Sequence, residues 1–280
     1  MIDYFDINLE HSINSGQVFL WKKENNDWYG INGQDVLKIN SQGRIETYSE
    51  NKIDFFRQSD NIEIILNSLS KDNITKQAIE KYIGLRLIRQ DPFQCLISFI
   101  VSSNSNIQKI KNTLENICKN FGKKIIYDEI EFFLFPKPRI LAEASIQEIK
   151  KCGAGYRAEF ILKASKMILS NQIDFEFLKN CPYNEAKNII LKIPGVGNKV
   201  ADCILLFSLE KLDAFPLDRW IIRILEKYYP EIFDLNTKSI TDKQYSLLHE
   251  KITKHFGPYC GYAQQFLFKM ERENYQKKWL

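Results

Sequence analysis

Ile193-Pro194-Gly195-Val196-Gly197 decides the fold of the second half of the chain, because it breaks a helical pattern that continues on both sides. The apolar residues of 184–192 fall on one side of a short helix. After the break, Asn198 is a suitable N-cap for a second helix that runs to Leu209. A proline and two glycines between two helical runs indicate a sharp turn. The sequence therefore predicts a helix-hairpin-helix over residues 184–209.

Gly195 and Gly197 let the backbone turn so that its N–H groups face outward at a helix N-terminus. Such a turn binds phosphate without any side chain, and the partner that it implies is a nucleic-acid backbone. A G-x-G pattern alone is weak support, because a tight corner between two helices has the same pattern.

Two side chains near this turn suggest chemistry. Lys199 lies in the first turn of the second helix, where the helix dipole disfavours an ammonium and leaves part of the lysine as a nucleophilic amine. Asp218 precedes the next predicted helix, Arg219–Tyr228, and would return to the same hairpin. Separately, Lys199 could contact phosphate or solvent, and Asp218 could be only an N-cap. Together, an amine, a carboxylate and a phosphate-binding turn suit the breaking of an N-glycosidic bond.

The rest of the chain predicts an α+β fold with two regions. Residues 1–85 are β-rich, with short strands at 18–21, 28–31, 36–39 and 44–48 that form an antiparallel meander. Residues 86–280 form a helical body that contains the hairpin. Its clearest helices are one that begins at Pro92 with Asp91 as the N-cap, one over Ile107–Phe121, and one that a Ser145/Glu148 capping box begins and Gly153 ends.

Composition sets limits on the class of protein. The 280 residues carry a net charge of +4, which permits an anionic partner without requiring one. No apolar run approaches the ~20 residues of a membrane helix, and the first residues do not form a signal peptide, so we expect an intracellular protein. The six cysteines stand singly without a C-x-x-C pair, which predicts core thiols in place of disulfides or a metal centre.

Several motifs, in order along the chain, resemble the helix-hairpin-helix DNA glycosylase superfamily, and within it the 8-oxoguanine DNA glycosylases with lyase activity. They are SGQVFLW at 15–21, QDPF at 90–93, SSNSN at 102–106, GYRA at 155–158, KIPGVGNKVADC at 192–203, FPLD at 215–218 and GPYCGYAQ at 257–264. The resemblance covers nearly the whole chain. It implies a TBP-like N-terminal sheet followed by the helical glycosylase body.

The resemblance also implies an activity and a site. The enzyme would flip 8-oxoguanine out of double-stranded DNA, attack C1′ of the sugar with Lys199, and cut the strand by β-elimination through a Schiff base, while Asp218 stabilises the oxocarbenium charge. Tyr156 would fill the space that the base leaves, and Asn104 and Arg157 would hold the orphaned cytosine. The base pocket that it implies consists of Gly16, Cys203, Gln264 and Phe268.

We expect no required cofactor, and the scattered cysteines predict no iron–sulfur cluster. The resemblance implies one possible ion. The main-chain carbonyls of Leu191, Ile193 and Val196 would hold a structural cation at the hairpin. We expect a monomer that acts on DNA in the cytoplasm or nucleoid.

Two positions depart from the family pattern. Lys109 stands where the animal enzymes carry a second arginine for the opposite cytosine, and it keeps the charge without the bidentate fork. The alternative is that Lys109 is simply a solvated lysine. Trp220 stands where those enzymes have a histidine that contacts a phosphate, so that contact is either remade or lost.

Three other classes of protein share part of this sequence pattern. An iron–sulfur glycosylase would need four clustered cysteines near the C-terminus, whereas only Cys260 follows Cys203. An alkylation-repair glycosylase would share the β-rich region but would not need Lys199. A helix-hairpin-helix module that binds DNA without catalysis is the third, and hydride trapping on lesion DNA separates it from a lyase.

Overall fold

The computed structural model describes residues 7–40, 43–50, 52–233 and 240–276. Its N-terminal region contains a four-stranded antiparallel meander in the order β1 (Trp21–Glu24), β2 (Asp27–Asn32), β3 (Asp35–Ile39) and β4 (Ile45–Thr47). The turn between β1 and β2 is tight, because Glu24 pairs directly with Asp27 and the two asparagines between them have positive φ. The predicted meander and the α+β class are confirmed.

The first strand begins three residues later than predicted, and the Gln17 side chain explains the difference. Its amide donates to the carbonyl of Arg86 at 2.9 Å and accepts the N–H of Ile88 at 3.0 Å. The segment after Gln17 is therefore buried against residues 86–88, and ladder pairing starts only at Trp21.

The turn between β2 and β3 attaches the sheet to the helical body. The N–H of Gly33 donates to Oε1 of Gln94 at 2.7 Å, and the N–H of Asp91 donates to Oδ1 of Asn32 at 2.7 Å. Gly33 has φ +62, and a Cβ there would lie 2.8 Å from the Asp91 carboxylate, so this contact requires glycine. The sheet therefore docks on the N-terminus of α4 (Pro92–Ser102), which Asp91 caps as predicted.

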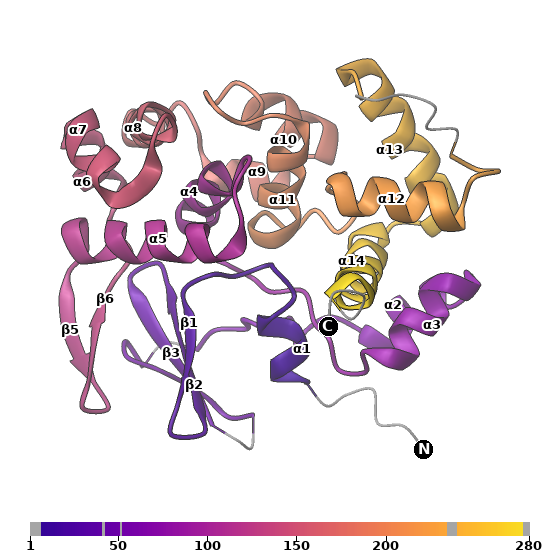
Figure 1. Cartoon of the computed structure of the whole chain (residues 1–280), viewed down its shortest axis with the longest axis horizontal. Helices are drawn as coiled ribbons and strands as arrows, with labels where there is room; N and C mark the ends of the chain where they lie inside the picture. The colour runs from indigo at the N-terminus through magenta and orange to yellow at the C-terminus, as the bar shows by residue number, and fades with distance from the viewer. Residues whose placement is uncertain (1–6, 41–42, 51, 234–239, 277–280) are drawn as a thin grey trace.

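The other helices surround α4 and α11 (Asn198–Ser208), as Figure 1 shows. Helices α5 (Ile107–Phe121) and α12 (Arg219–Tyr228) have the predicted bounds. The remaining elements are α1 (Leu9–Ile13), α2 (Ile62–Leu69), α3 (Asn73–Lys81), α5 (Ile107–Phe121), α6 (Pro138–Glu143), α7 (Ile146–Ile149), the π-helical η1 (Lys150–Ala154), α8 (Arg157–Leu169), α9 (Phe175–Asn180), α10 (Tyr183–Ile190), α12 (Arg219–Tyr228), α13 (Asp242–Phe256) and α14 (Cys260–Gln276).

A β-hairpin that the sequence analysis did not predict interrupts the helical body. Strands β5 (Lys124–Tyr127) and β6 (Ile130–Phe133) follow α5 and pair only with each other. Ile125 and Phe132 pack with Tyr29 and Val36 of the N-terminal sheet in a separate small core, as the position of the hairpin beside the sheet in Figure 1 indicates. The hairpin thus gives the sheet a second attachment to the body.

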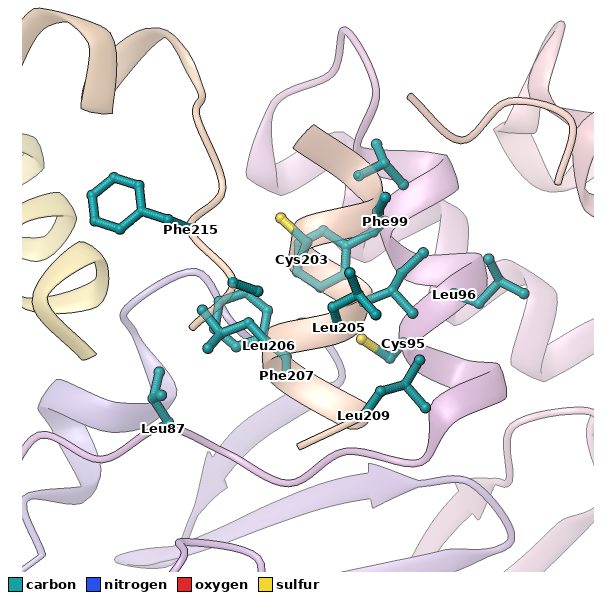
Figure 2. Close-up of a cluster of buried hydrophobic side chains, with 14 of the residues drawn as sticks. Leu87, Cys95, Leu96, Phe99, Cys203, Leu205, Leu206, Phe207, Leu209 and Phe215 are labelled. Atoms are coloured by element: carbon teal, nitrogen blue, oxygen red, sulfur yellow. The ribbon is translucent and has the colours of Figure 1, made fainter. Parts of the chain in front are cut away.

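The main core is centred on α11, in which every residue from Val200 to Ser208 is buried. Figure 2 shows side chains of α4 and α11 interleaved, and the rings of Phe99 and Phe207 stack with centroids 5.5 Å apart. All six cysteines are buried and unpaired, as predicted. Within the described residues, no helix is both long and apolar enough to cross a membrane.

Candidate active site at the hairpin

The hairpin joins α10 to α11, with one small difference from the prediction. Gly197 is the N-cap of α11, and Asn198 is its first helical residue, with a side chain that donates to Asp242 at 2.7 Å. No side chain caps the first N–H groups of α11 within the described residues. These groups are therefore available to an external acceptor such as a phosphate.

The two hairpin glycines have different structural roles. Gly195 has φ +85, and a Cβ there would lie 2.5 Å from the ring of Phe160 on α8, so the fold itself requires glycine. Gly197 is exposed, has an ordinary φ of −96°, and has no atom within 4 Å of where a Cβ would be. Gly197 thus leaves open space in which another backbone can approach the N-terminus of α11.

Lys199 and Asp218 lie together at this end of α11. The Lys199 amine lies 5.2 Å from the centre of the Phe99 ring. The Asp218 carboxylate caps α12 by accepting the N–H groups of Trp220 and Ile221, each at 2.9 Å. Burial raises the pKa of Asp218, while the Ile221 N–H and the Lys199 charge act in the opposite direction. An amine and a carboxylate are therefore close enough to influence each other electrostatically.

Cys203 lies one turn after Lys199 and is fully buried. Burial raises the pKa of the Cys203 thiol to about 12, although the Lys199 charge opposes that shift. At neutral pH the sulfur is therefore a protonated thiol, which is a poor nucleophile beside the lysine.

Gly16 and Phe268 meet where the segment after α1 contacts α14, the helix that also carries Gln264. Gly16 has φ +84, and a Cβ there would lie 3.2 Å from Cε1 of Phe268. The contact is held by Gln265, which donates to the carbonyl of Ser15 at 2.8 Å. Gln264 is buried, and its Oε1 has no partner among the described residues. A buried amide oxygen without a partner is unfavourable unless a ligand donor completes it.

Arg157, the first residue of α8, contacts both Tyr156 and the segment that carries Asn104. The Arg157 guanidinium is buried and lies 4.5 Å from the centre of the Tyr156 ring. Its Nε donates to the carbonyl of Ser103 at 2.9 Å, and its Nη2 donates to the carbonyl of Asn104 at 3.1 Å. Asn104 is exposed with φ +49, and Tyr156 is 57% exposed. Arg157 thus fixes the loop that presents Asn104, and Tyr156 projects into solvent.

Lys109 is exposed in the first turn of α5. It lines an open groove of about 390 Å³ together with Asn106, Asn112 and Gly153. The structure shows no hydrogen bond or ion pair between Lys109 and Asn104, which lies in the segment that links α4 to α5.

The sequence analysis did not identify a buried polar cluster behind the hairpin. Asp202 accepts the hydroxyls of Tyr183 at 2.8 Å and Tyr245 at 2.6 Å, and it pairs with Lys187 at 3.1 Å. Burial raises the pKa of Asp202, and the Lys187 charge opposes that shift. The sequence does contain one signal of this cluster, because Asp202 lies inside the otherwise apolar run 200–207 and a buried charge needs polar partners. Those partners lie on α10 and α13, which the sequence does not place.

The carbonyls of Leu191, Ile193 and Val196 belong to the segment between α10 and α11, and that of Ile193 accepts the N–H of Val196 at 3.1 Å. Oxygen donors of this type suit a hard cation. Among the residues that the structure describes, His, Cys, Asp and Glu side chains form no cluster suited to a metal ion.

Comparison with known proteins agrees with this architecture. Residues 2–96 match the family model of the 8-oxoguanine DNA glycosylase N-terminal domain, and residues 97–250 match that of the HhH-GPD superfamily base excision DNA repair proteins. The chain belongs to the HhH-GPD superfamily of base excision DNA repair proteins and carries the N-terminal domain of its 8-oxoguanine branch.

Particular relatives cover most of the chain. A probable N-glycosylase/DNA lyase of Methanothermobacter thermautotrophicus is 31% identical over 73% of this chain and 69% of its own length. The N-glycosylase/DNA lyase OGG1 of Arabidopsis thaliana is 29% identical over 96% of this chain and 79% of its own length. A structure of the Clostridium acetobutylicum 8-oxoguanine glycosylase/lyase contains double-stranded DNA with cytosine opposite 8-oxoG. That chain is 30% identical to this one and superposes with a TM-score of 0.85, and the match covers 96% of this chain and 93% of that chain.

Proposed function

We propose that this protein excises 8-oxoguanine from double-stranded DNA and cuts the resulting abasic strand. The observation that carries the proposal is the proximity of the Lys199 amine to the Asp218 carboxylate, beside an uncapped helix N-terminus. The names of the relatives support the same activity, since they are N-glycosylase/DNA lyases and 8-oxoguanine glycosylases.

In the proposed reaction, the N–H groups of the hairpin near Gly195 and Gly197 bind a backbone phosphate next to the lesion. Tyr156 enters the space left by the flipped base, and Asn104, with Lys109, contacts the orphaned cytosine. The buried Arg157 guanidinium donates to the Asn104 carbonyl and so supports the loop that carries Asn104. It lies close enough to this loop to contribute to the contact with the cytosine. Flipping costs a few kcal/mol, which these contacts and the base pocket offset.

The base occupies a pocket formed by Gly16, Cys203, Gln264 and Phe268. Phe268 stacks on the base, and the unpartnered Oε1 of Gln264 accepts from its Watson–Crick edge. The Gly16 carbonyl accepts the proton that 8-oxoguanine carries on N7, where guanine presents a lone pair instead. This single contact favours the oxidised base over guanine.

The Lys199 amine then forms a bond to C1′ through its lone pair as the bond from C1′ to the base nitrogen breaks, and the base leaves with its electron pair. The Asp218 carboxylate stabilises the positive charge that develops on the sugar. Loss of the amine proton and ring opening give a Schiff base, and removal of a C2′ proton expels the 3′ phosphate by β-elimination.

The chain needs no cofactor for these steps. A cation held by the carbonyls of Leu191, Ile193 and Val196 would stiffen the hairpin and add positive charge near the phosphate. We further propose that the protein acts as a monomer on intracellular DNA, in the cytoplasm or nucleoid.

The test is a cleavage assay on duplexes that carry 8-oxoguanine opposite each of the four bases, with borohydride added in a parallel reaction. We expect cleavage opposite cytosine and an irreversible protein–DNA adduct. Binding to the duplexes without cleavage or adduct would show a non-catalytic module. Base release without an adduct would show a glycosylase that does not use an amine.

A further inference from the structure

A cavity of about 250 Å³ adjoins the proposed base pocket on the side of Gly16. Three elements form it, namely the segment after α1, the start of α5 and the C-terminal half of α14. Gly16, Ile107, Lys111, Lys269, Arg272 and Glu273 are among the residues that line it. The cavity is large compared with the ~30 Å³ of one water molecule, and its charged side chains are mostly cationic.

Arg272 is the cavity residue that touches the proposed base pocket. A Cβ on Gly16 would lie 3.4 Å from Nη1 of Arg272 and 3.2 Å from Cε1 of Phe268. Gln264, Phe268 and Arg272 are spaced by four residues along α14 and therefore share one face of the helix. The Arg272 guanidinium is therefore next in line after the Gln264 amide and the Phe268 ring, which are proposed to hold the base.

The donors of Arg272 are not used by the protein. Within the described part of the chain, the guanidinium makes no hydrogen bond or ion pair, although it is half-buried. Its neighbour Glu273 is already engaged, by Lys269 at 2.9 Å and by the hydroxyl of Tyr82 at 3.0 Å. Burial accordingly lowers the pKa of Arg272, with only partial opposition from Glu273. An arginine with five N–H donors in such a position is suited to an external acceptor.

The chemistry of the lesion supplies such an acceptor. 8-Oxoguanine differs from guanine by a proton on N7 and by a carbonyl oxygen on the adjacent carbon, C8. If the Gly16 carbonyl accepts the N7 proton, a donor next to Gly16 faces the C8 oxygen. Guanine has no oxygen at that position and would leave the donor unpaired.

We propose that Arg272 donates to the C8 carbonyl oxygen of the flipped base, so that the protein recognises oxidised purines by that oxygen as well as by N7. This inference rests on the proposed function. The competing role for a cation at this position is contact with a DNA phosphate, which would not depend on the base.

Binding measurements can separate these roles. Arg272→Leu is introduced into the Lys199→Gln protein, which cannot remove the base, and affinity is measured for two duplexes. One carries 8-oxoguanine opposite cytosine, and the other carries a tetrahydrofuran abasic analogue. Arg44→Leu is the matched control, because the Arg44 side chain, directly before β4, is 76% exposed.

We expect Arg272→Leu to weaken binding of the 8-oxoguanine duplex by about tenfold to a hundredfold while binding of the abasic analogue stays unchanged. Arg272→Lys should fall between wild type and Arg272→Leu, because it keeps one donor. With Lys199 restored, Arg272→Leu should cleave a preformed abasic site at the wild-type rate, which also shows that the variant is folded.

Equal losses on both duplexes would identify Arg272 as a phosphate contact and overturn the proposal, as would unchanged affinity for both. Failure of the proposed function is seen separately, because the wild-type protein would then leave 8-oxoguanine duplexes uncut whatever residue occupies position 272.

Discussion

The hydroxyl of Tyr245 donates to Oδ2 of Asp202 at 2.6 Å, and this bond links the helix that carries Lys199 to the loop that carries Asp218. The same hydroxyl oxygen accepts the N–H of Leu217 at 3.1 Å, one residue before Asp218. Asp202 lies on α11, three residues after Lys199. The relative position of the two proposed reacting groups therefore depends on a phenol contributed by α13.

Tyr245→Phe should slow base excision more than it weakens lesion binding. The change leaves the Leu217 N–H without a buried partner and removes one of the hydrogen bonds to Asp202, which costs about 1–3 kcal/mol of unfolding free energy. We expect a single-turnover rate at least ~10 times lower, since small displacements of reacting groups strongly affect rates. Tyr48→Phe, at an exposed tyrosine, is the control. An unchanged rate in a destabilised variant would limit the cluster to a role in folding.

Lys199→Gln should abolish both base release and borohydride trapping, because the amide cannot act as the amine nucleophile. Binding to lesion DNA should remain, since the hairpin N–H groups and the base pocket do not involve the Lys199 amine. Gel-based trapping and equilibrium binding on the same duplex measure both effects. A trapped adduct formed at the wild-type rate would show that another amine is the nucleophile.

Asp218→Asn should lower the chemical rate by about a hundredfold or more while lesion affinity changes little. The asparagine oxygen can still cap α12 by accepting from Trp220 and Ile221, so the helix should keep its N-terminus. Single-turnover kinetics and thermal unfolding measure the two effects separately. A wild-type rate in this variant would remove Asp218 from the reaction.

The two hairpin glycines should respond differently to alanine. Gly195→Ala places a Cβ against Phe160 at a positive φ and should reduce the unfolding free energy by roughly 1–3 kcal/mol. Gly197→Ala meets no atom and should leave stability nearly unchanged, but the added methyl should weaken DNA binding. Denaturant unfolding and binding to undamaged duplex measure both variants. Equal binding by Gly197→Ala and wild type would place the phosphate elsewhere.

Lys109→Arg should sharpen the preference for cytosine opposite the lesion. A guanidinium can bind two acceptors of the orphaned base, which discriminates between bases by ~1–3 kcal/mol, whereas the lysine offers only a point charge. Single-turnover rates opposite cytosine, thymine, guanine and adenine test this. Rates that keep their wild-type ratios would show that Lys109 is a solvated residue without influence on the opposite base.

The sequence by itself determined the local structure of much of the chain. The bounds of Ile107–Phe121 and Arg219–Tyr228 follow from apolar spacing between strong capping residues, and the capping box at Ser145 begins its helix as predicted. Turn residues, namely adjacent asparagines or a glycine, separated the predicted strands of the meander. These signals act over a few residues, so they can be recognised without knowledge of the fold.

Only the tertiary structure decided which distant side chains meet. The hairpin β5–β6 is held by packing on the N-terminal sheet, and the late start of β1 depends on Gln17 bonding to residues 86–88. The partners of Asp202 and the approach of Arg272 to Gly16 likewise join segments far apart in the chain. Such contacts depend on how whole elements pack, because the burial that makes a polar partner necessary exists only after the core has formed.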